Sequence, residues 1–148
     1  MTVSLCPITA DNFMEAFRLK LRSDQEKFVS HPIRSLAQAY VYRDQCQPFG
    51  ICDGDRMVGY VMVIYDYDIP EYDIWHMMID DSQQGKGFGR AALHRVLDYI
   101  AQKPFGDSNR VALTCSKENP IALRLYQSLG FRLTGNEDDD EVELARTV

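Results

Sequence analysis

The spacing of apolar positions predicts strands and helices along the whole chain. Residues Val3–Ile8 alternate apolar and polar side chains, as a half-buried strand does. A helix follows, with Thr9 or Asp11 as its cap, and a second helix has Pro32 in its first turn. The first of these helices repeats apolar residues every four positions: Phe13, Phe17 and Leu21.

The middle of the chain predicts a hairpin, a loop and another strand. Two β-rich runs, Gln47–Cys52 and Met57–Tyr65, flank an Asp-Gly turn. Residues Asp66–Asp73 interleave acids with tyrosines around Pro70, which predicts a loop. The apolar run Tyr72–Ile79 is then a strand that leads into a glycine-rich segment.

The last third of the chain predicts two further helices. The helix after the glycines has a continuous apolar stripe. A short apolar strand, Arg110–Cys115, precedes a helix that Asn119 and Pro120 begin and Gly130 ends. The apolar face of this helix is predicted to be buried: Ile121, Ala122, Leu125, Tyr126 and Leu129.

Two short runs, Phe131–Thr134 and Val142–Ala145, predict a final hairpin. The complete order is β-α-α-β-β-β-α-β-α-β-β, and the chain contains no repeat and no linker. We therefore expect a single domain over residues 1–148.

The composition is typical of a globular protein that works in water. A chain of 148 residues can bury a substantial core, and no apolar run approaches the about 18 residues of a membrane span. The N-terminal segment lacks the features of a signal peptide. The net charge of −6 disfavours nucleic acid as a partner and is compatible with a cationic substrate. We expect a cytoplasmic protein with neither a membrane nor a nucleic-acid partner.

The spacing of cysteines and histidines predicts no metal site. The four cysteines form no C-x-x-C pair, and the three histidines lack the spacing of metal ligands. The cysteines are expected to be reduced.

The glycine-rich segment Gln83-Gln84-Gly85-Lys86-Gly87-Phe88-Gly89-Arg90 carries the strongest functional signal. Its glycines are too closely spaced for a dinucleotide-binding G-x-G-x-x-G, and no hydroxyl residue follows its Gly-Lys, as a P-loop requires. It fits Q/R-x-x-G-x-G/A, with Gln84, Gly87 and Gly89 in place. In this it resembles the acetyl-CoA pyrophosphate loop of the GNAT N-acetyltransferases. A glycine turn without a ligand is the alternative.

A second segment resembles the same family. Asn119-Pro120-Ile121-Ala122-Leu123-Arg124-Leu125-Tyr126, followed by Leu129-Gly130-Phe131, resembles the family's N-x-x-A-x-x-L-Y…G-F helix. The resemblance implies the GNAT fold, an α/β (α+β) fold with a central mixed, mostly antiparallel sheet of roughly six to seven strands and about four helices.

The resemblance also implies roles for two residues of this helix. Asn119 would meet the pantetheine side of the cofactor, and Tyr126 would return a proton to the leaving thiolate. A phenol with a pKa near 10 is protonated at neutral pH, which suits such a donor. The alternative is that Tyr126 only fills the core face of its helix.

Main-chain and side-chain groups around the glycines are the predicted cofactor contacts. Amides of the preceding strand would polarise the thioester carbonyl if that strand is splayed from its neighbour. Polar side chains of the loop would add contacts to the phosphates. The predicted contacts with acetyl-CoA are Met77, Met78, Ile79, Gln84, Gly85, Lys86, Gly87, Phe88, Gly89, Arg90, Asn119 and Tyr126.

The base that would accept the amine proton is not evident from the sequence. An alkyl ammonium group is neutral in only ~0.1% of copies at pH 7, so an acceptor or a chain of waters should help. Many relatives carry a Glu on the strand before the loop, where this chain offers Asp73 and His76. Neither residue clearly matches, and His76 is equally well explained as a packed strand residue.

Three further segments resemble the bacterial spermine/spermidine (diamine) N-acetyltransferases: residues 24–29, Pro48–Ile51 and Met78–Asp80. This subgroup implies a polyamine substrate, for which carboxylates and tyrosine faces of the acidic loop would be suited. A solvated loop is the alternative. The predicted substrate contacts are Glu26, Asp66, Asp68, Glu71, Tyr72, Asp73, Trp75 and His76.

Together these patterns predict an N-acetyltransferase that moves acetyl from acetyl-CoA directly to a primary amine in a ternary complex. The preferred acceptor is a polyamine, spermidine or spermine. A protein N-terminus or lysine, an amino acid and an aminoglycoside-like drug stay open as acceptors, as does a non-catalytic CoA-binding domain. Relatives are often dimers, and the sequence leaves the choice between monomer and homodimer open.

Overall fold

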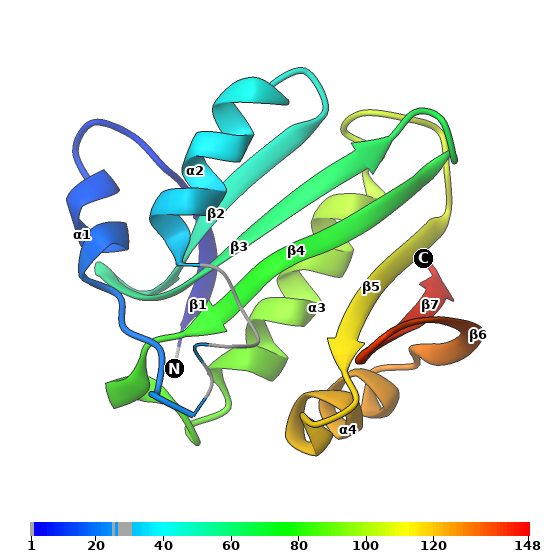
Figure 1. Ribbon diagram of the computed structural model, residues 1–148. Coiled ribbons are helices and arrows are strands. Elements are labelled where there is room, and N and C mark those ends of the chain that lie inside the picture. The colour runs from blue at the N-terminus through cyan, green and yellow to red at the C-terminus, as the bar shows by residue number, and fades with distance from the viewer. Residues whose placement is uncertain (1, 25, 27–30) are drawn as a thin grey trace.

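A computed structural model describes residues 2–24, 26 and 31–148 (Figure 1). Within these residues seven strands form one sheet in the order β1-β2-β3-β4-β5-β7-β6. The elements are β1 (Val3–Pro7), α1 (Phe13–Arg18), α2 (Pro32–Val41), β2 (Cys46–Asp53), β3 (Arg56–Asp66), β4 (Glu71–Ile79), the 3-10 turn η1 (Asp81–Gln83), α3 (Phe88–Ala101), β5 (Arg110–Ser116), α4 (Pro120–Ser128), β6 (Arg132–Asp138) and β7 (Glu141–Thr147). The predicted order of strands and helices is confirmed.

Helices cover both faces of the sheet, and each face has its own apolar core. Helices α1 and α2 lie on one face, while α3 and α4 lie on the other (Figure 1). Side chains of β3 alternate between the two cores: Val61 and Val63 pack on the α3–α4 side, and Tyr60 and Met62 pack on the α1–α2 side.

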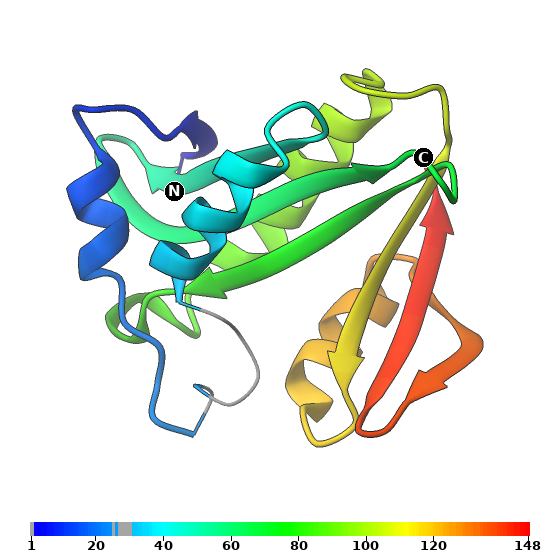
Figure 2. The same ribbon diagram turned by 45° about the horizontal axis from the view of Figure 1, so that its top comes forward.

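Strands β4 and β5 are parallel and are paired only where they begin. Their pairing consists of Tyr72 with Val111 and Asp73 with Ala112. Beyond these pairs the two strands diverge, as Figure 2 shows towards their C-terminal ends. The condition for cavity-facing amides on β4, that it be splayed from its neighbour, is therefore met. It leaves one edge of β4 without a strand partner in the described part of the chain, and unpaired edges expose main-chain donors and acceptors.

A β-bulge interrupts β4 near its middle. The ladder with β3 is regular as far as Trp75 and resumes at Met78, so His76 and Met77 together oppose the single residue Val61. His76 adopts a left-handed conformation with φ 57°. Because of the extra residue, Trp75 and Met78 both pack on the α1–α2 side although they are three positions apart.

The loop predicted over Asp66–Asp73 extends too far at its C-terminal end, so that boundary of the prediction is wrong. Strand β4 already begins at Glu71, which pairs with Asp66 of β3. The turn is therefore confined to residues 67–70. The sequence shows Pro70 as a break but not the partner strands that hold the next residues extended.

The first helix also departs from its prediction. It ends at Arg18, before Leu21, and its N-cap is Asn12 in place of Thr9 or Asp11. The Asn12 side chain accepts a hydrogen bond from the Thr9 N–H (2.8 Å), which stabilises the turn before the helix. The phenylalanines of the predicted apolar stripe, Phe13 and Phe17, are 38% and 37% exposed, and Ala16 is the residue that faces the core.

Candidate active site

The glycine loop has the backbone conformation that its sequence predicts. Gly85 and Gly87 have φ values of 77° and 88°, a region that residues with a Cβ rarely adopt. Helix α3 begins directly after Gly87, and its N-terminus has no side-chain cap. The first amides of α3 are thus left available, and with the positive end of the helix dipole they favour an anion.

Asp80 anchors the loop between two parts of the chain. Its carboxylate accepts hydrogen bonds from the N–H of Ser82 (3.1 Å) and of Lys20 (2.8 Å), and the Asp81 N–H donates to the Lys20 carbonyl (2.7 Å). Burial opposes ionisation of Asp80, but the hydrogen bonds from the Ser82 hydroxyl and from the N–H groups of Lys20 and Ser82 hold its pKa below the ordinary value. The charged carboxylate therefore fixes the entry to the loop.

A cavity of 680 Å3 lies between β4, the glycine loop, the start of α3 and one face of α4. Most of the predicted cofactor contacts line it: Met77, Ile79, Gln84, Gly85, Gly87, Phe88, Gly89, Arg90, Asn119 and Tyr126. Sequence reasoning missed several other lining residues: Gln83, Ile121, Ala122, Arg124, Leu125 and Ser128.

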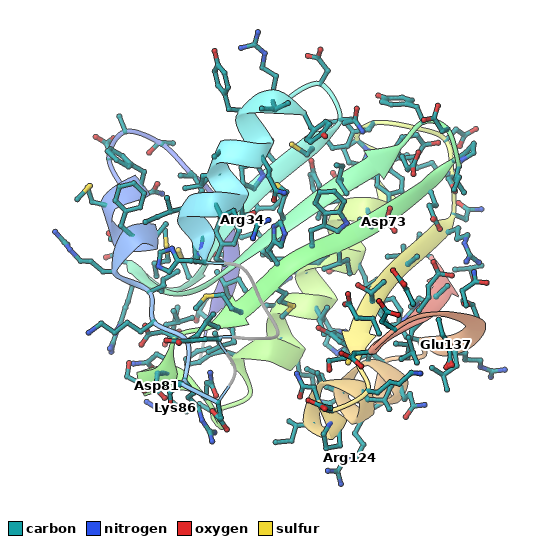
Figure 3. All side chains as sticks on the ribbon, in the orientation of Figure 1. Arg34, Asp73, Asp81, Lys86, Arg124 and Glu137 are labelled. Carbon is teal, nitrogen blue, oxygen red and sulfur yellow. The ribbon has the colours of Figure 1, made fainter. Side chains whose placement is uncertain are left out.

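Two predicted cofactor side chains are placed elsewhere among the described residues. Met78 is buried on the α1–α2 side of the sheet. Lys86 donates from Nζ to Gln83 Oε1 (3.2 Å) and lies beside Asp81 at the lower edge of the molecule (Figure 3). The Lys86 ammonium group is therefore hydrogen-bonded within the loop itself, to Gln83.

The main chain at the end of β4 faces the cavity. The Asp80 N–H donates to the Val58 carbonyl of β3 (2.8 Å), so by strand alternation the main-chain groups of Ile79 point to the opposite, unpaired edge. There the Ile79 carbonyl accepts a hydrogen bond from Gln84 Nε2 (3.0 Å). Loop and strand edge are thereby joined into one surface.

Leu129 is buried as predicted, but the rest of the apolar face of α4 lines this cavity and is not fully buried in the core. Ile121 is 68% exposed, and Ala122, Leu125 and Tyr126 are only partly buried. The periodicity identified the correct face, but it does not distinguish a core from a cavity that a ligand could fill. Asn119 caps the helix by accepting from the Ala122 N–H (3.3 Å).

Arg124 is a polar residue of the cavity that the sequence did not identify as a cofactor contact. It lies one residue before the apolar Leu125, yet it lines the same cavity as Arg90. Its Nε donates to the Pro120 carbonyl (3.3 Å), and the side chain extends from α4 at the bottom of Figure 3. Its presence in the N-x-x-A-x-x-L-Y segment was the available signal.

Tyr126 lines the cavity as a protonated phenol. Burial, with a smaller contribution from Cys115, raises its pKa to about 12. Its ring packs edge-on against Phe131, with 6.1 Å between ring centroids. No hydrogen bond to its hydroxyl is present in the described part of the chain, so the proton is available to a group that enters the cavity.

Glu71 and Tyr72, two of the predicted substrate residues, are buried and held by residues outside β4. Glu71 is buried, and its Oε2 accepts from Arg110 Nε (2.8 Å). Tyr72 is fully buried, its hydroxyl donates to the Gly106 carbonyl (2.7 Å), and it accepts from the N–H groups of Phe105 and Gly106. Glu71 thus fixes the start of β4 against β5, and Tyr72 fixes it against the turn that precedes β5.

The other predicted substrate residues are dispersed. Asp66 Oδ1 accepts from the N–H groups of Asp68 and Ile69, which shapes the turn. Asp68 and Glu26 are exposed. Trp75 packs on the α1–α2 side. In the segment 24–29, which carried part of the predicted resemblance, residues 25 and 27–29 lie outside the described residues.

Asp73 is a partly buried carboxyl group where β4 and β5 separate (Figure 3). Burial raises its pKa to about 7, and the carboxylates of Glu71, Asp66 and Glu143 add to the shift while Arg110 opposes it. Asp73 is therefore a carboxyl group that can exchange a proton near neutral pH.

We expect Asp73→Asn to stabilise the protein increasingly as pH rises. The pKa of Asp73 is higher in the folded state, so folding favours the protonated carboxyl and becomes less favourable as pH rises from about 4 to about 7. The gain should grow from near zero at pH 4 to at most ~4 kcal/mol at pH 8. Urea denaturation at the two pH values measures it. An equal effect of the substitution at both values would contradict the raised pKa.

Comparison with known proteins identifies the class of group-transfer enzyme to which a chain with this fold belongs. The acetyltransferase (GNAT) family matches residues 11–131 of this chain. The chain therefore belongs to the acetyltransferase (GNAT) family, which confirms the predicted fold and enzyme class.

Individual relatives are similar at low identity. The spermine/spermidine N(1)-acetyltransferase of Bacillus subtilis is 25% identical over 147 residues, which cover 93% of each chain. The spermidine N(1)-acetyltransferase of Vibrio cholerae is 27% identical over 100 residues, or 67% of this chain and 57% of that protein. The predicted resemblance to this subgroup is confirmed.

Solved structures of low identity share the fold. The spermidine N-acetyltransferase of Vibrio cholerae in complex with CoA and spermine has a TM-score of 0.79 at 20% identity, covering 98% of this chain and 95% of that one. An aminoglycoside acetyltransferase in complex with coenzyme A has a TM-score of 0.78 at 17% identity, covering 99% and 95%.

Two observations bear on other partners. No group of three or more His, Cys, Asp or Glu residues in the described ranges could hold a metal ion. None of the helices in the described part of the chain combines the length and apolar character needed to span a membrane.

Proposed function

We propose that this protein transfers acetyl from acetyl-CoA to a primary amine of a polyamine by direct attack in a ternary complex. The observation that carries the proposal is the cavity, which joins an anion-binding loop, an unpaired strand edge, an apolar helix face and a protonated phenol. Acetyl-CoA carries its thioester on a pantetheine arm, whose amides and methylenes suit a strand edge beside an apolar face, and this arm leads to a diphosphate, which suits the loop.

The cofactor would lie along the cavity in one direction. Its diphosphate would accept hydrogen bonds from the amides of Gly85–Gly89 and meet the N-terminus of α3. Its pantetheine arm would run beside the free edge of β4, opposite the apolar face of α4. Arg90 and Arg124 would add charged contacts from the two helices.

The transfer itself requires three events. The neutral amine attacks the thioester carbonyl, a nitrogen–carbon bond forms, and the carbon–sulfur bond breaks. Main-chain amides on the unpaired edge of β4, at Ile79 and in the bulge at Met77, would stabilise the carbonyl oxygen as it gains negative charge. Tyr126 would give its proton to the leaving thiolate, while the amine loses a proton to solvent.

Polyamine as the acceptor is supported by relatives and by charge. Several relatives are named as spermine or spermidine acetyltransferases. The chain has a net charge of −6, and Asp73 and Glu143 place carboxyl groups near the point where β4 and β5 diverge. Two or more separated cationic amines would complement such a surface.

An assay of CoA release tests the proposal. Purified protein with acetyl-CoA should release free CoA in the presence of spermidine or spermine, and mass spectrometry should detect the monoacetylated product. A panel with an N-terminal peptide, a lysine peptide, free amino acids and an aminoglycoside ranks the other acceptors. CoA binding without turnover on any amine would refute the proposed activity and favour a binding domain.

We expect Arg124→Ala to raise KM for acetyl-CoA about 10-fold with little change in kcat. A charge-assisted contact with a phosphate contributes about 1.5–3 kcal/mol, and this contact is made before and during the reaction alike. Steady-state kinetics at saturating spermidine measures the effect. Arg43→Ala is a suitable control, since Arg43 stacks on Tyr40 at the end of α2 and is not among the residues that line the cavity. Equal KM values for the two variants would contradict a cofactor contact.

A further inference from the structure

A buried chain of hydrogen bonds connects the bulge of β4 to helix α2. His76 Nδ1 lies 2.8 Å from Ser35 Oγ, and Ser35 Oγ lies 2.7 Å from the Tyr60 hydroxyl. Ser35 and Tyr60 are both 0% exposed. The three polar groups lie on the α1–α2 side of the sheet, with Ser35 and Tyr60 fully buried and His76 partly buried, on the opposite face from the cofactor cavity.

Each member of this network is committed to its neighbours. Ser35 is the hydrogen-bond partner of the Tyr60 hydroxyl within the described residues, and Ser35 also lies 3.7 Å from Met62 Sδ. The serine hydroxyl can accept from Tyr60 and turn towards either Met62 or His76, so it can satisfy either tautomer of the imidazole. Burial, with Arg34 nearby, lowers the pKa of His76, which keeps the ring neutral.

The network acts on a strained part of the backbone. His76 has φ 57° and is one of the two residues that bulge from β4 opposite Val61. A left-handed residue with a Cβ costs roughly 1–2 kcal/mol and persists when its surroundings hold it. The next residue, Met77, lines the cofactor cavity, so the bulge sets how β4 is presented there.

We propose that His76 is a positioning residue for acetyl transfer: its hydrogen bond to Ser35, backed by Tyr60, holds the bulge so that Met77 and the amides after it face the thioester. The inference rests on the proposed function and deepens it. It also connects helix α2, on one face of the sheet, with the reacting bond on the other. His76 touches neither reactant in this role, which separates it from a general base.

Three variants separate the backbone effect from the hydrogen bond. His76→Gly allows the left-handed conformation but removes the contact with Ser35. His76→Asn allows the same conformation and places a polar atom where Nδ1 was. Ser35→Ala keeps the imidazole and removes its partner. All three are compared with wild type in kcat, KM for acetyl-CoA and thermal stability, at a temperature where each is folded.

The expected result is a loss of kcat of about 10- to 100-fold in His76→Gly and Ser35→Ala, with His76→Asn near wild type and KM for acetyl-CoA little changed. Unchanged kcat in His76→Gly and Ser35→Ala would overturn the proposal, leaving the network a role in folding alone. Equal loss in His76→Asn and His76→Gly would overturn it too, because the imidazole itself would then be the acting group.

An amide NMR spectrum of the unliganded protein tests the inference apart from the enzymatic activity. Ser35→Ala should shift the amide resonances of His76 and Met77 while leaving those of the distant β6–β7 hairpin in place. Absence of these shifts would refute the positioning network even if the enzyme is active. If the wild-type protein lacks turnover but Ser35→Ala produces the shifts, the proposed activity is refuted, and with it the role of His76 in acetyl transfer, while the structural coupling stands.

Discussion

Tyr126→Phe should lower kcat by about 100- to 10,000-fold, the range associated with loss of a general acid. The substitution removes one oxygen from the cavity wall and keeps the ring that packs against Phe131. The thiolate would then leave without a positioned proton donor. CoA affinity, measured by calorimetry, should change little because the phenol is proposed to act on the leaving group and not on cofactor binding.

Tyr99→Phe provides the matched control for this substitution. Tyr99 is also a partly buried tyrosine, but it lies on α3 and packs edge-on against Phe49 at 4.9 Å, outside the lining of the cavity. Removal of the Tyr99 hydroxyl should leave kcat near the wild-type value. A kcat for Tyr126→Phe as high as that of Tyr99→Phe would remove Tyr126 from the mechanism and leave it a packing role.

Gly87→Ala should weaken CoA binding at least about 10-fold, equivalent to about 1.4 kcal/mol. Gly87 is the left-handed residue at the N-cap of α3, with φ 88°, and an L-residue there costs roughly 1–2 kcal/mol. Relaxation of that strain would turn the first amides of α3 away from the diphosphate. Calorimetric titration with CoA measures the affinity, and urea denaturation measures the cost to stability.

Gly54→Ala separates the loss of stability from the loss of binding. Gly54 has φ 59° in the hairpin between β2 and β3, and a Cβ added there would meet no heavy atom within 4 Å. It carries a similar backbone penalty far from the loop. Both variants should lose stability, but only Gly87→Ala should lose CoA affinity. Equal affinities in the two variants would show that the loop does not hold the diphosphate.

Local sequence was sufficient for the elements and for the glycine loop. Asp-Gly produced the expected hairpin with Gly54 in a left-handed conformation, and Asn119 with Pro120 began α4 where expected. The loop could be predicted because left-handed glycines followed by a helix are dictated by φ and by helix ends, which involve only neighbouring residues. Together with the resemblance to the family, this reasoning located most of the cavity lining.

Features that depend on distant partners were not predictable. Arg124 and Ile121 line the cavity because β4 and β5 diverge, and no periodicity in α4 reveals that divergence. The strand start at Glu71 and its ion pair with Arg110 join residues 39 positions apart. Such contacts depend on which strand lies beside which, and that is a property of the whole sheet.

The sequence by itself determined the order of elements, the family and the conformation of the glycine loop, since these follow from side-chain periodicity, short motifs and glycine backbone freedom. Only the tertiary structure decided the splay of β4 from β5, the bulge at His76 with its link to Ser35, and the burial that raises the pKa of Asp73. The physical reason is that strand pairing, desolvation and charge proximity arise between residues far apart in the chain, and these interactions exist only once the sheet has formed.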